Sequence, residues 1–289
     1  MSKLLEQYIK QTSKSFKADD IFIEVVVKEK DKIKITYVNI KDKKTNKQIY
    51  FETTEAFFTP FGCSNSAQYP DSYSIVASFN KDNEHDMNFF SELKKLEGMI
   101  LDKISEESKT LFKKKMTKEE ILLKEKFSSK VQINNVDKPD GTKITYHQIN
   151  LKISSDKAQN KPITILFSED DTIIPKYNYD KDKELTKDAA WKLIKDYIPR
   201  QTKLRAIFVP KVNVMSSNIS FSFSVSQILA PKFEKKEETV FGFSGVAPTK
   251  STTTSSSASA AASLSKASAE DTEEEEVEEE EEEEEDEDD

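Results

Sequence analysis

Alternation between apolar and polar residues predicts β-strands along much of the chain. It is clearest in the segment IKITYVNI, residues 33–40, whose period of two is that of a half-buried strand. Tyr37 shares the face of Ile33 and Ile35, which predicts that its ring belongs to the core. Similar patterns predict further strands at residues 21–27, 48–53, 73–79, 131–135, 143–153, 163–168, 203–215 and 219–229. The last two flank a short polar segment at 216–218 and are expected to form a hairpin.

Apolar residues spaced three and four apart predict helices elsewhere. One long amphipathic helix is expected within residues 89–112, and the capping box Thr117-Lys118-Glu119-Glu120 opens a second one. Thr186 can cap a third helix, in which Trp191 lies on the packed face, and weak periodicity in residues 3–16 predicts a short helix. Many strands with two inserted helical blocks predict a β-rich α+β fold, either a sandwich or a barrel.

The composition changes sharply near residue 233. Residues 233–269 are dominated by Ser, Thr and Ala and lack a lasting apolar period. Such a segment cannot bury enough surface to offset its conformational entropy, so we expect a disordered linker. Residues 270–289 form an acidic tail that repels itself and should stay extended. We therefore expect one folded core over residues 1–232, followed by the linker and the tail.

The charge of the chain is divided at the same place. The formal net charge is −9 over 289 residues. The last 20 residues contain 18 Asp and Glu and no Lys or Arg, so the remainder carries +9, with 44 basic and 35 acidic residues. The acidic average therefore describes a basic body joined to a polyanionic tail, and it does not argue against a nucleic-acid ligand.

Several classes of function are disfavoured by what the sequence lacks. Its five glycines include no G-x-G-x-x-G or G-x-x-x-x-G-K arrangement, which argues against a nucleotide hydrolase or a dinucleotide enzyme. His85 and His147 have no nucleophile motif beside them, and with the single Cys63 they are too few for a Cys/His zinc site. We therefore expect a protein that is not an enzyme, with no catalytic residues, no metal and no cofactor.

The sequence also suggests a location. No apolar run approaches the roughly 18 residues that cross a bilayer, so we expect no membrane contact. Met1–Lys10 has no apolar stretch like that of a signal peptide, and the lone Cys63 cannot form an internal disulfide. We expect an intracellular protein in a reducing compartment, not a secreted one.

Basic and aromatic residues are interleaved on several predicted strands. A surface that binds a single strand needs this mixture, because lysines neutralise phosphates and rings stack on unpaired bases at about 1–3 kcal/mol per base. The alternative is that the rings form the core and the lysines lie at solvated edges. The candidate nucleic-acid-binding residues are Lys34, Lys143, Tyr146, Lys152, Lys203, Arg205, Phe208 and Lys211.

The acidic tail is a second functional signal. Its charge density is similar to that of a nucleic-acid strand, and a flexible linker would hold it near the basic body at roughly millimolar effective concentration. We expect it to compete with the strand for its groove and, once displaced, to bind basic patches on other proteins. The alternative is a tail that only keeps the protein soluble. The tail residues assigned to this role are Glu283, Glu285, Asp286, Asp288 and Asp289.

Four segments together resemble a known family. They are FETTEAFFTPFGCSN, SYSIVASF, FFSELKKLEGMILDKI and IPRQTKLRAIFVPKVNVMSSNISFSFSVSQILA, in this order along the chain. This series is similar to the single-stranded-DNA-binding proteins of the phage T-seven type found in large nucleocytoplasmic DNA viruses. One departure is the C-terminus, which reads Glu287-Asp288-Asp289 where the phage protein ends in an aromatic residue.

The resemblance implies an OB-fold core, that is, an OB-fold-like Greek-key barrel with inserted helices, which binds single-stranded DNA without strong sequence preference. It implies a role in DNA replication, recombination or repair, with a tail that recruits replication proteins such as a polymerase, primase or helicase. It also implies a viral replication compartment in the host cytoplasm or nucleus, with packaging in the virion as a further option.

Two other classes stay open from the sequence. One is an acid-tailed histone chaperone, although the basic body does not suit direct histone binding. The other is a virion or nuclear scaffold protein. A homodimer is also left open.

Overall fold

The computed structural model describes residues 8–30, 33–66, 69–124, 127–137, 141–156, 158–169, 174–214 and 219–231. The expected linker and acidic tail, and the expected turn at 216–218, lie outside these ranges.

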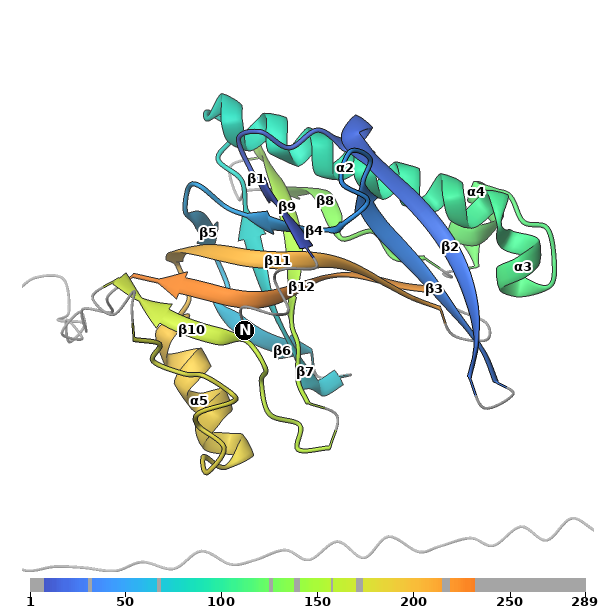
Figure 1. Cartoon of the computed structure of the whole chain (residues 1–289). Helices are drawn as coiled ribbons and strands as arrows, with labels where there is room; N and C mark the ends of the chain where they lie inside the picture. Colours follow the sequence, from blue (N-terminus) through green and yellow to red (C-terminus); the bar gives the residue numbers. More distant parts are fainter. Residues whose placement is uncertain are drawn as a thin grey trace, which may run out of the picture. The chain divides into compact units, whose positions relative to one another are not determined.

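Five strands close into a barrel. Four of them, β7 (Tyr69–Ser78), β9 (Lys143–Ile153), β11 (Thr202–Val214) and β12 (Ile219–Ala230), are long, whereas β5 (Phe57–Thr59) is short. The circle runs β11, β5, β7, β9, β12 and back to β11, with the β9–β12 pair parallel and the others antiparallel. In Figure 1, β11 and β12 cross in front of β7 and β9. This confirms the predicted β-rich α+β fold with an OB-fold-like barrel, and the sandwich alternative is wrong.

The length of β11 allows it to pair beyond the barrel. Its last part pairs with β4 at Ile207 and Phe208 and with β3 at Val212 and Asn213. These pairs attach further strands to the barrel. The remaining strands are β1 (Tyr8–Thr12), β2 (Ile21–Lys30), β3 (Ile33–Asp42), β4 (Gln48–Glu52), β6 (Cys63–Ser66), β8 (Val131–Asp137) and β10 (Ile165–Ser168).

The helices begin at the caps that their sequences supply. Asn83 caps α2, Thr117 forms the predicted capping box of α4, and Thr186 caps α5. The predicted long helix is divided, because the backbone leaves helical geometry at Glu107 between α2 and α3. Trp191 is buried and stacks on Tyr73 at 4.0 Å, which confirms its expected place in the core. The helices are α2 (Glu84–Glu106), α3 (Ser108–Phe112), α4 (Lys118–Leu123) and α5 (Lys187–Tyr197), with the short 3-10 turn η1 (Ala18–Asp20).

One glycine is required by the packing of a turn. Gly62 lies between β5 and β6 with a φ of +64°, and a Cβ atom there would lie 2.4 Å from the carbonyl oxygen of Ile198. The next N–H, that of Cys63, donates to the same carbonyl at 2.9 Å. A side chain at position 62 would therefore separate this turn from the end of α5.

The structure corrects two expectations at the N-terminal end. The segment 3–16 was expected to be helical, but Tyr8–Thr12 is strand β1, paired in parallel with β4. This pairing supplies backbone hydrogen bonds that outweigh a weak local periodicity. Tyr37 was expected in the core, but this residue is 43% exposed. At this point of β3 the buried face carries Val38 and Ile40 instead.

In the described ranges, no helix is long and apolar enough to span a membrane.

Candidate nucleic-acid interface

The outer face of the β11–β12 hairpin is built by strict alternation in β12. Phe221, Phe223 and Val225 are buried in the core, and the serines between them point to the other side of the sheet. Ser222 and Ser224 have little exposed surface because neighbouring elements rise around them. Ser224 and Ser226 lie on this face, and both hydroxyl groups have partners, because Ser224 Oγ contacts Ser154 Oγ and Ser226 Oγ donates to the Ile207 carbonyl oxygen at 3.1 Å.

A groove runs over this face. Two cavities of about 310 Å³ and 180 Å³ adjoin, since both are lined by Tyr8, Val209 and Lys211. Their walls carry four tyrosines that come from four separate segments. We call this feature the tyrosine groove and define it by Tyr8, Tyr37, Tyr50, Tyr179 and Lys211.

Each tyrosine is positioned by a different element. Tyr8 comes from β1, Tyr37 from β3 and Tyr50 from β4, while Tyr179 lies in the segment between β10 and α5. Burial raises the pKa of Tyr8, and it is also the main cause that raises the pKa of Tyr179. These two phenols are therefore neutral at physiological pH, and their rings offer uncharged surfaces for stacking.

Lysines without acidic partners lie along the groove. Partial burial, which removes water from the ammonium group, lowers the pKa of Lys211. The like charge of Lys152 lowers this pKa further. Lys130 is affected in the same way, mainly by burial, while Glu97 opposes the shift and Lys152 adds to it. Among the described residues, neither Lys152 nor Lys211 forms an ion pair with a carboxylate. One carboxylate, Asp180, lines the groove beside Tyr179.

Two of the predicted site residues, Tyr146 and Lys203, lie together in a different cavity. Tyr146 of β9 and Lys203 of β11 line a cavity of about 570 Å³ together with Phe58 of β5. We call it the β5–β9 cleft. Its other charged lining residues are Lys81, Glu55, Asp82 and Asp86, so three carboxylates accompany two lysines. This balance does not favour a phosphate there.

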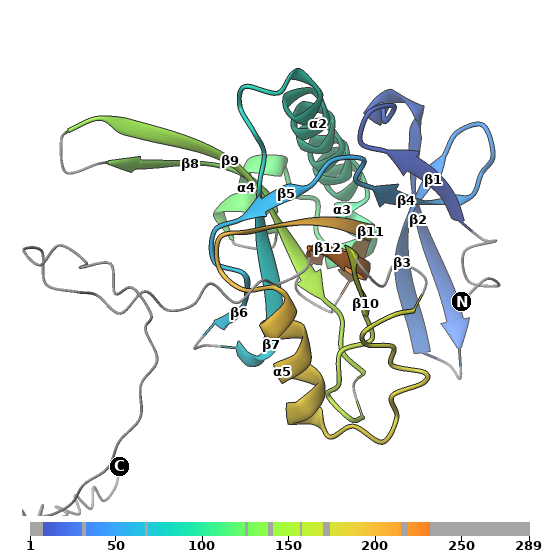
Figure 2. The same ribbon diagram turned by 90° about the vertical axis from the view of Figure 1, so that its left-hand side faces the viewer.

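Two further predicted lysines lie on hairpins. Lys143 is exposed and pairs with Asp137 at 3.8 Å on the β8–β9 hairpin, which projects from the barrel in Figure 2. Lys34 lies in β3, in register with Glu29 of β2. Lys143 does not line the tyrosine groove.

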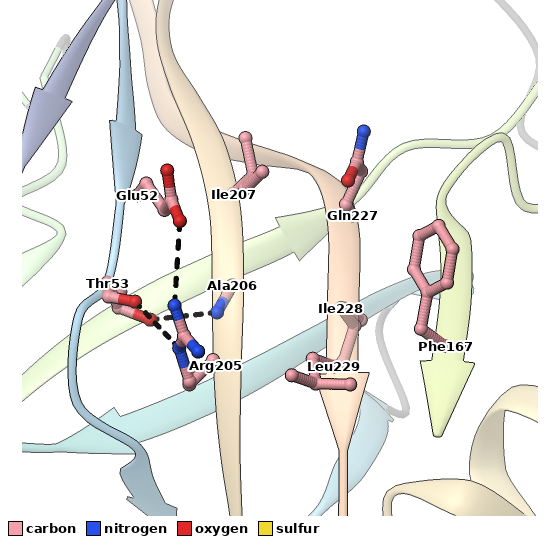
Figure 3. A pocket seen from close by; sticks show the side chains of 9 residues that line it. All are labelled: Glu52, Thr53, Phe167, Arg205, Ala206, Ile207, Gln227, Ile228 and Leu229. Atoms are coloured by element: carbon pink, nitrogen blue, oxygen red, sulfur yellow. Dashed lines mark hydrogen bonds and ion pairs between the residues drawn. The ribbon is translucent and has the colours of Figure 1, made fainter. Parts of the chain in front are cut away.

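Arg205 lies beyond one end of the groove and is already engaged. Its Nη2 lies 3.5 Å from Glu52 Oε1, and its Nε donates to the carbonyl oxygen of Thr53 at 3.0 Å (Figure 3). The side chain therefore has a fixed position and an acidic partner.

The prediction for Phe208 is wrong. The residue has no exposed surface, and its ring packs against Phe51 at 5.3 Å and Phe223 at 5.6 Å between centroids. Its position on β11 places it on the inner face of the barrel, together with Leu204, Ala206 and Val212. It cannot stack on a base without unfolding the core.

None of the four groove tyrosines was among the site residues predicted from sequence, and Tyr37 was expected in the core. Tyr50 carries a local signal, because in QIYFE it alternates with the buried Ile49 and Phe51. Tyr8 and Tyr179 lie outside every strand expected from the pattern, and only the folded chain brings them to the groove.

The solved structures to which this chain is similar include phage proteins. The single-stranded DNA-binding protein of bacteriophage Enc34 is 13% identical, with 78% of this chain and 96% of that chain covered and a TM-score of 0.34. Its complex with single-stranded DNA matches with 12% identity, 73% and 97% coverage and a TM-score of 0.34. The single-stranded DNA-binding protein gp2.5 of bacteriophage T7 matches with 10% identity, 65% and 96% coverage and a TM-score of 0.34. No family model and no curated protein matches the chain. The function is therefore argued below from this chain's own residues.

Proposed function

We propose that this protein binds single-stranded DNA without strong sequence preference, through the tyrosine groove. The observation that carries the proposal is the convergence of four tyrosines from separate segments beside Lys211 and Lys152. Aromatic rings stack on any unpaired base, and lysines neutralise the phosphates of the same strand.

The groove suits a single strand better than a duplex. Stacking on tyrosine rings requires bases that are free of a partner strand. The floor includes Ser224 and Ser226, whose hydroxyl groups cannot distinguish one base from another as bidentate Arg or Asn contacts do.

The main test is a fluorescence titration of the full chain with oligo-dT and with a duplex of equal length. We expect tight binding of oligo-dT, weaker binding of the duplex, and a logarithmic salt slope of about −0.7 for each phosphate contacted. Equal affinity for both ligands, or no binding at about 50 mM salt, would contradict the proposal. An oligo-rU of the same length in parallel shows whether the strand preference extends to RNA.

We further propose that the acidic tail competes for this groove. The tail carries 18 acidic residues and no basic ones within residues 270–289, so it can compete electrostatically with a strand. Deletion of these residues should tighten strand binding, and a tail of the same length with neutral Ser and Thr should do so equally. Unchanged affinity in both variants would remove this part of the proposal.

A role in replication, recombination or repair, in a viral replication compartment, follows as part of the same proposal. A displaced tail would be a free acidic ligand for a polymerase, primase or helicase. Pull-down of such a protein by the full chain, but not by the tail-deleted chain, would be the expected result.

A further inference from the structure

A carboxylate joins two cations just beyond the tyrosine groove. Glu52 Oε2 lies 2.9 Å from Lys10 Nζ, and Glu52 Oε1 lies 3.5 Å from Arg205 Nη2. These residues come from three different strands, β4, β1 and β11. One negative group is therefore held between two positive ones.

Glu52 and Arg205 line a cavity that continues the groove, and Lys10 contacts Glu52 from β1. The cavity has a volume of about 190 Å³ and shares Gln227 with the larger part of the groove. Figure 3 shows Glu52 and Arg205 on one side of β12 and the ring of Phe167 on the other. The cavity thus combines an aromatic ring, Phe167, with one cation, Arg205, and Lys10 reaches the Glu52 carboxylate that lines it.

The three charged side chains are accessible to a ligand. The exposed fraction is 50% for Lys10, 26% for Glu52 and 43% for Arg205. Arg205 would keep its position if the carboxylate left, because its Nε donates to the Thr53 carbonyl oxygen at 3.0 Å. Thr53 is held in turn by the Ala206 N–H, which donates to its Oγ1 at 2.9 Å.

We propose that Lys10 and Arg205 form a phosphate site of the bound strand, and that Glu52 occupies this site in the free protein. This inference rests on the proposed function. A phosphate group carries the same sign of charge as a carboxylate and offers several acceptor oxygens to the same donors. When a strand enters, its phosphate replaces the Glu52 carboxylate between the two cations. Glu52 therefore lowers the affinity for the strand and limits how far the strand extends past the groove.

A double-mutant cycle tests the masking of Arg205 by Glu52. The four proteins are the full chain, Glu52→Gln, Arg205→Gln and the double variant, each titrated with oligo-dT at several salt concentrations. In the chain with Glu52, Arg205→Gln should weaken binding by about twofold or less, because the cation is already neutralised. In the Glu52→Gln background, the same change should weaken binding by about fivefold or more, the size of an ordinary coupling between neighbouring residues. Glu52→Gln alone should tighten binding and steepen the salt slope by about 0.7 for each phosphate gained.

The matched control is Glu24→Gln, which removes the same charge from an ion pair with Lys41 at 2.8 Å on strands β2 and β3. It should not couple to Arg205→Gln. Thermal melting checks that all variants are folded. If Arg205→Gln has the same effect with and without Glu52, or if Glu24→Gln couples to it equally, the masking proposal is wrong. If the unmodified chain fails to bind oligo-dT, the proposed function itself fails, so the two failures are distinct.

Discussion

The tyrosine groove and the β5–β9 cleft contain the same kinds of side chain, since each combines partly exposed rings with lysines. They differ in their carboxylates. Among the lining residues, the cleft has Glu55, Asp82 and Asp86 for two lysines, whereas the groove has Asp180 for one lysine, Lys211. Outside the lining, Lys14 pairs with Glu55 at the cleft, while Lys152 acts on Lys211 and Asp156 on Tyr179 at the groove.

The difference shows why a basic and aromatic pattern is not sufficient to locate a binding surface. A phosphate responds to the sum of nearby charges, and acidic residues that fold against a lysine cancel its attraction. In the cleft, Glu55 is itself held by Lys14 at 3.2 Å and by Asn83 at 2.6 Å, so its position is fixed. Burial raises the pKa of Asp86, and even so the cleft has no excess of positive charge. The following predictions test whether the two regions differ in function as they do in charge.

The largest effect is expected from the groove lysines. The double variant Lys152→Ala and Lys211→Ala should weaken oligo-dT binding by on the order of 100-fold at low salt, because two charge-assisted phosphate contacts are lost. The salt slope should become shallower by about 1.4. The double variant Lys81→Ala and Lys203→Ala removes the same charge from the cleft. An equal loss of affinity in that control would mean that the cleft, too, contacts the strand.

The next effect compares two rings of similar exposure. Tyr37 in the groove is 43% exposed, and Phe58 in the cleft is 39% exposed. Tyr37→Ala should cost about 1–3 kcal/mol of strand binding, the range for loss of one stacked base, and Tyr37→Phe should retain most of it. Phe58→Ala should leave affinity nearly unchanged, as measured by the same titration. A larger loss from Phe58→Ala than from Tyr37→Ala would reverse our assignment of the two regions.

The smallest effect concerns pH. Because the pKa of Lys211 lies below the usual range, its ammonium group loses its proton earlier than an ordinary lysine as the pH rises. Strand binding should therefore begin to weaken at a lower pH than it would with a lysine of the ordinary pKa of about 10.4. Oligo-dA is the ligand for this series, since adenine has no proton that ionises near this pH.

The matched variants separate the cause of this pH dependence. Lys152→Ala removes the like charge, so the pKa of Lys211 should rise and the decline should move to higher pH. Lys203→Ala in the cleft should not change the pH at which strand binding declines. A decline at the same pH in all three proteins would show that Lys211 is not the titrating group.

Much of the fold could be read from local patterns. The β11–β12 hairpin was predicted within two residues of its observed bounds, because its alternation is long and regular. The caps Thr117 and Thr186 fixed the starts of α4 and α5, since a hydroxyl that accepts from the N3 amide acts locally. The strands β5 and β6 were missed because they are short. The partners of β5, in β7 and β11, are also distant in sequence, whereas β6 pairs with the next strand, β7.

The candidate site was harder to predict than the fold. Lys152 and Lys211 were identified, and the structure places both beside the groove. Arg205 was predicted as a binding residue, but no local pattern indicates that Glu52 would neutralise it. Phe208 was misassigned because an alternating strand does not reveal which of its faces is the core side when both carry large residues.

The sequence by itself determined most of the strands and helices, the division into a basic body and an acidic tail, and the chemical types available for binding. These follow from periodicity, capping and composition, which act over a few residues or over the whole chain. Only the tertiary structure decided which rings and charges meet. Tyr8, Tyr37, Tyr50 and Tyr179 are far apart in the chain, and they share one groove because β1, β3 and β4 are arranged around the end of β11. Long-range strand pairing sets these contacts, and no local signal encodes it.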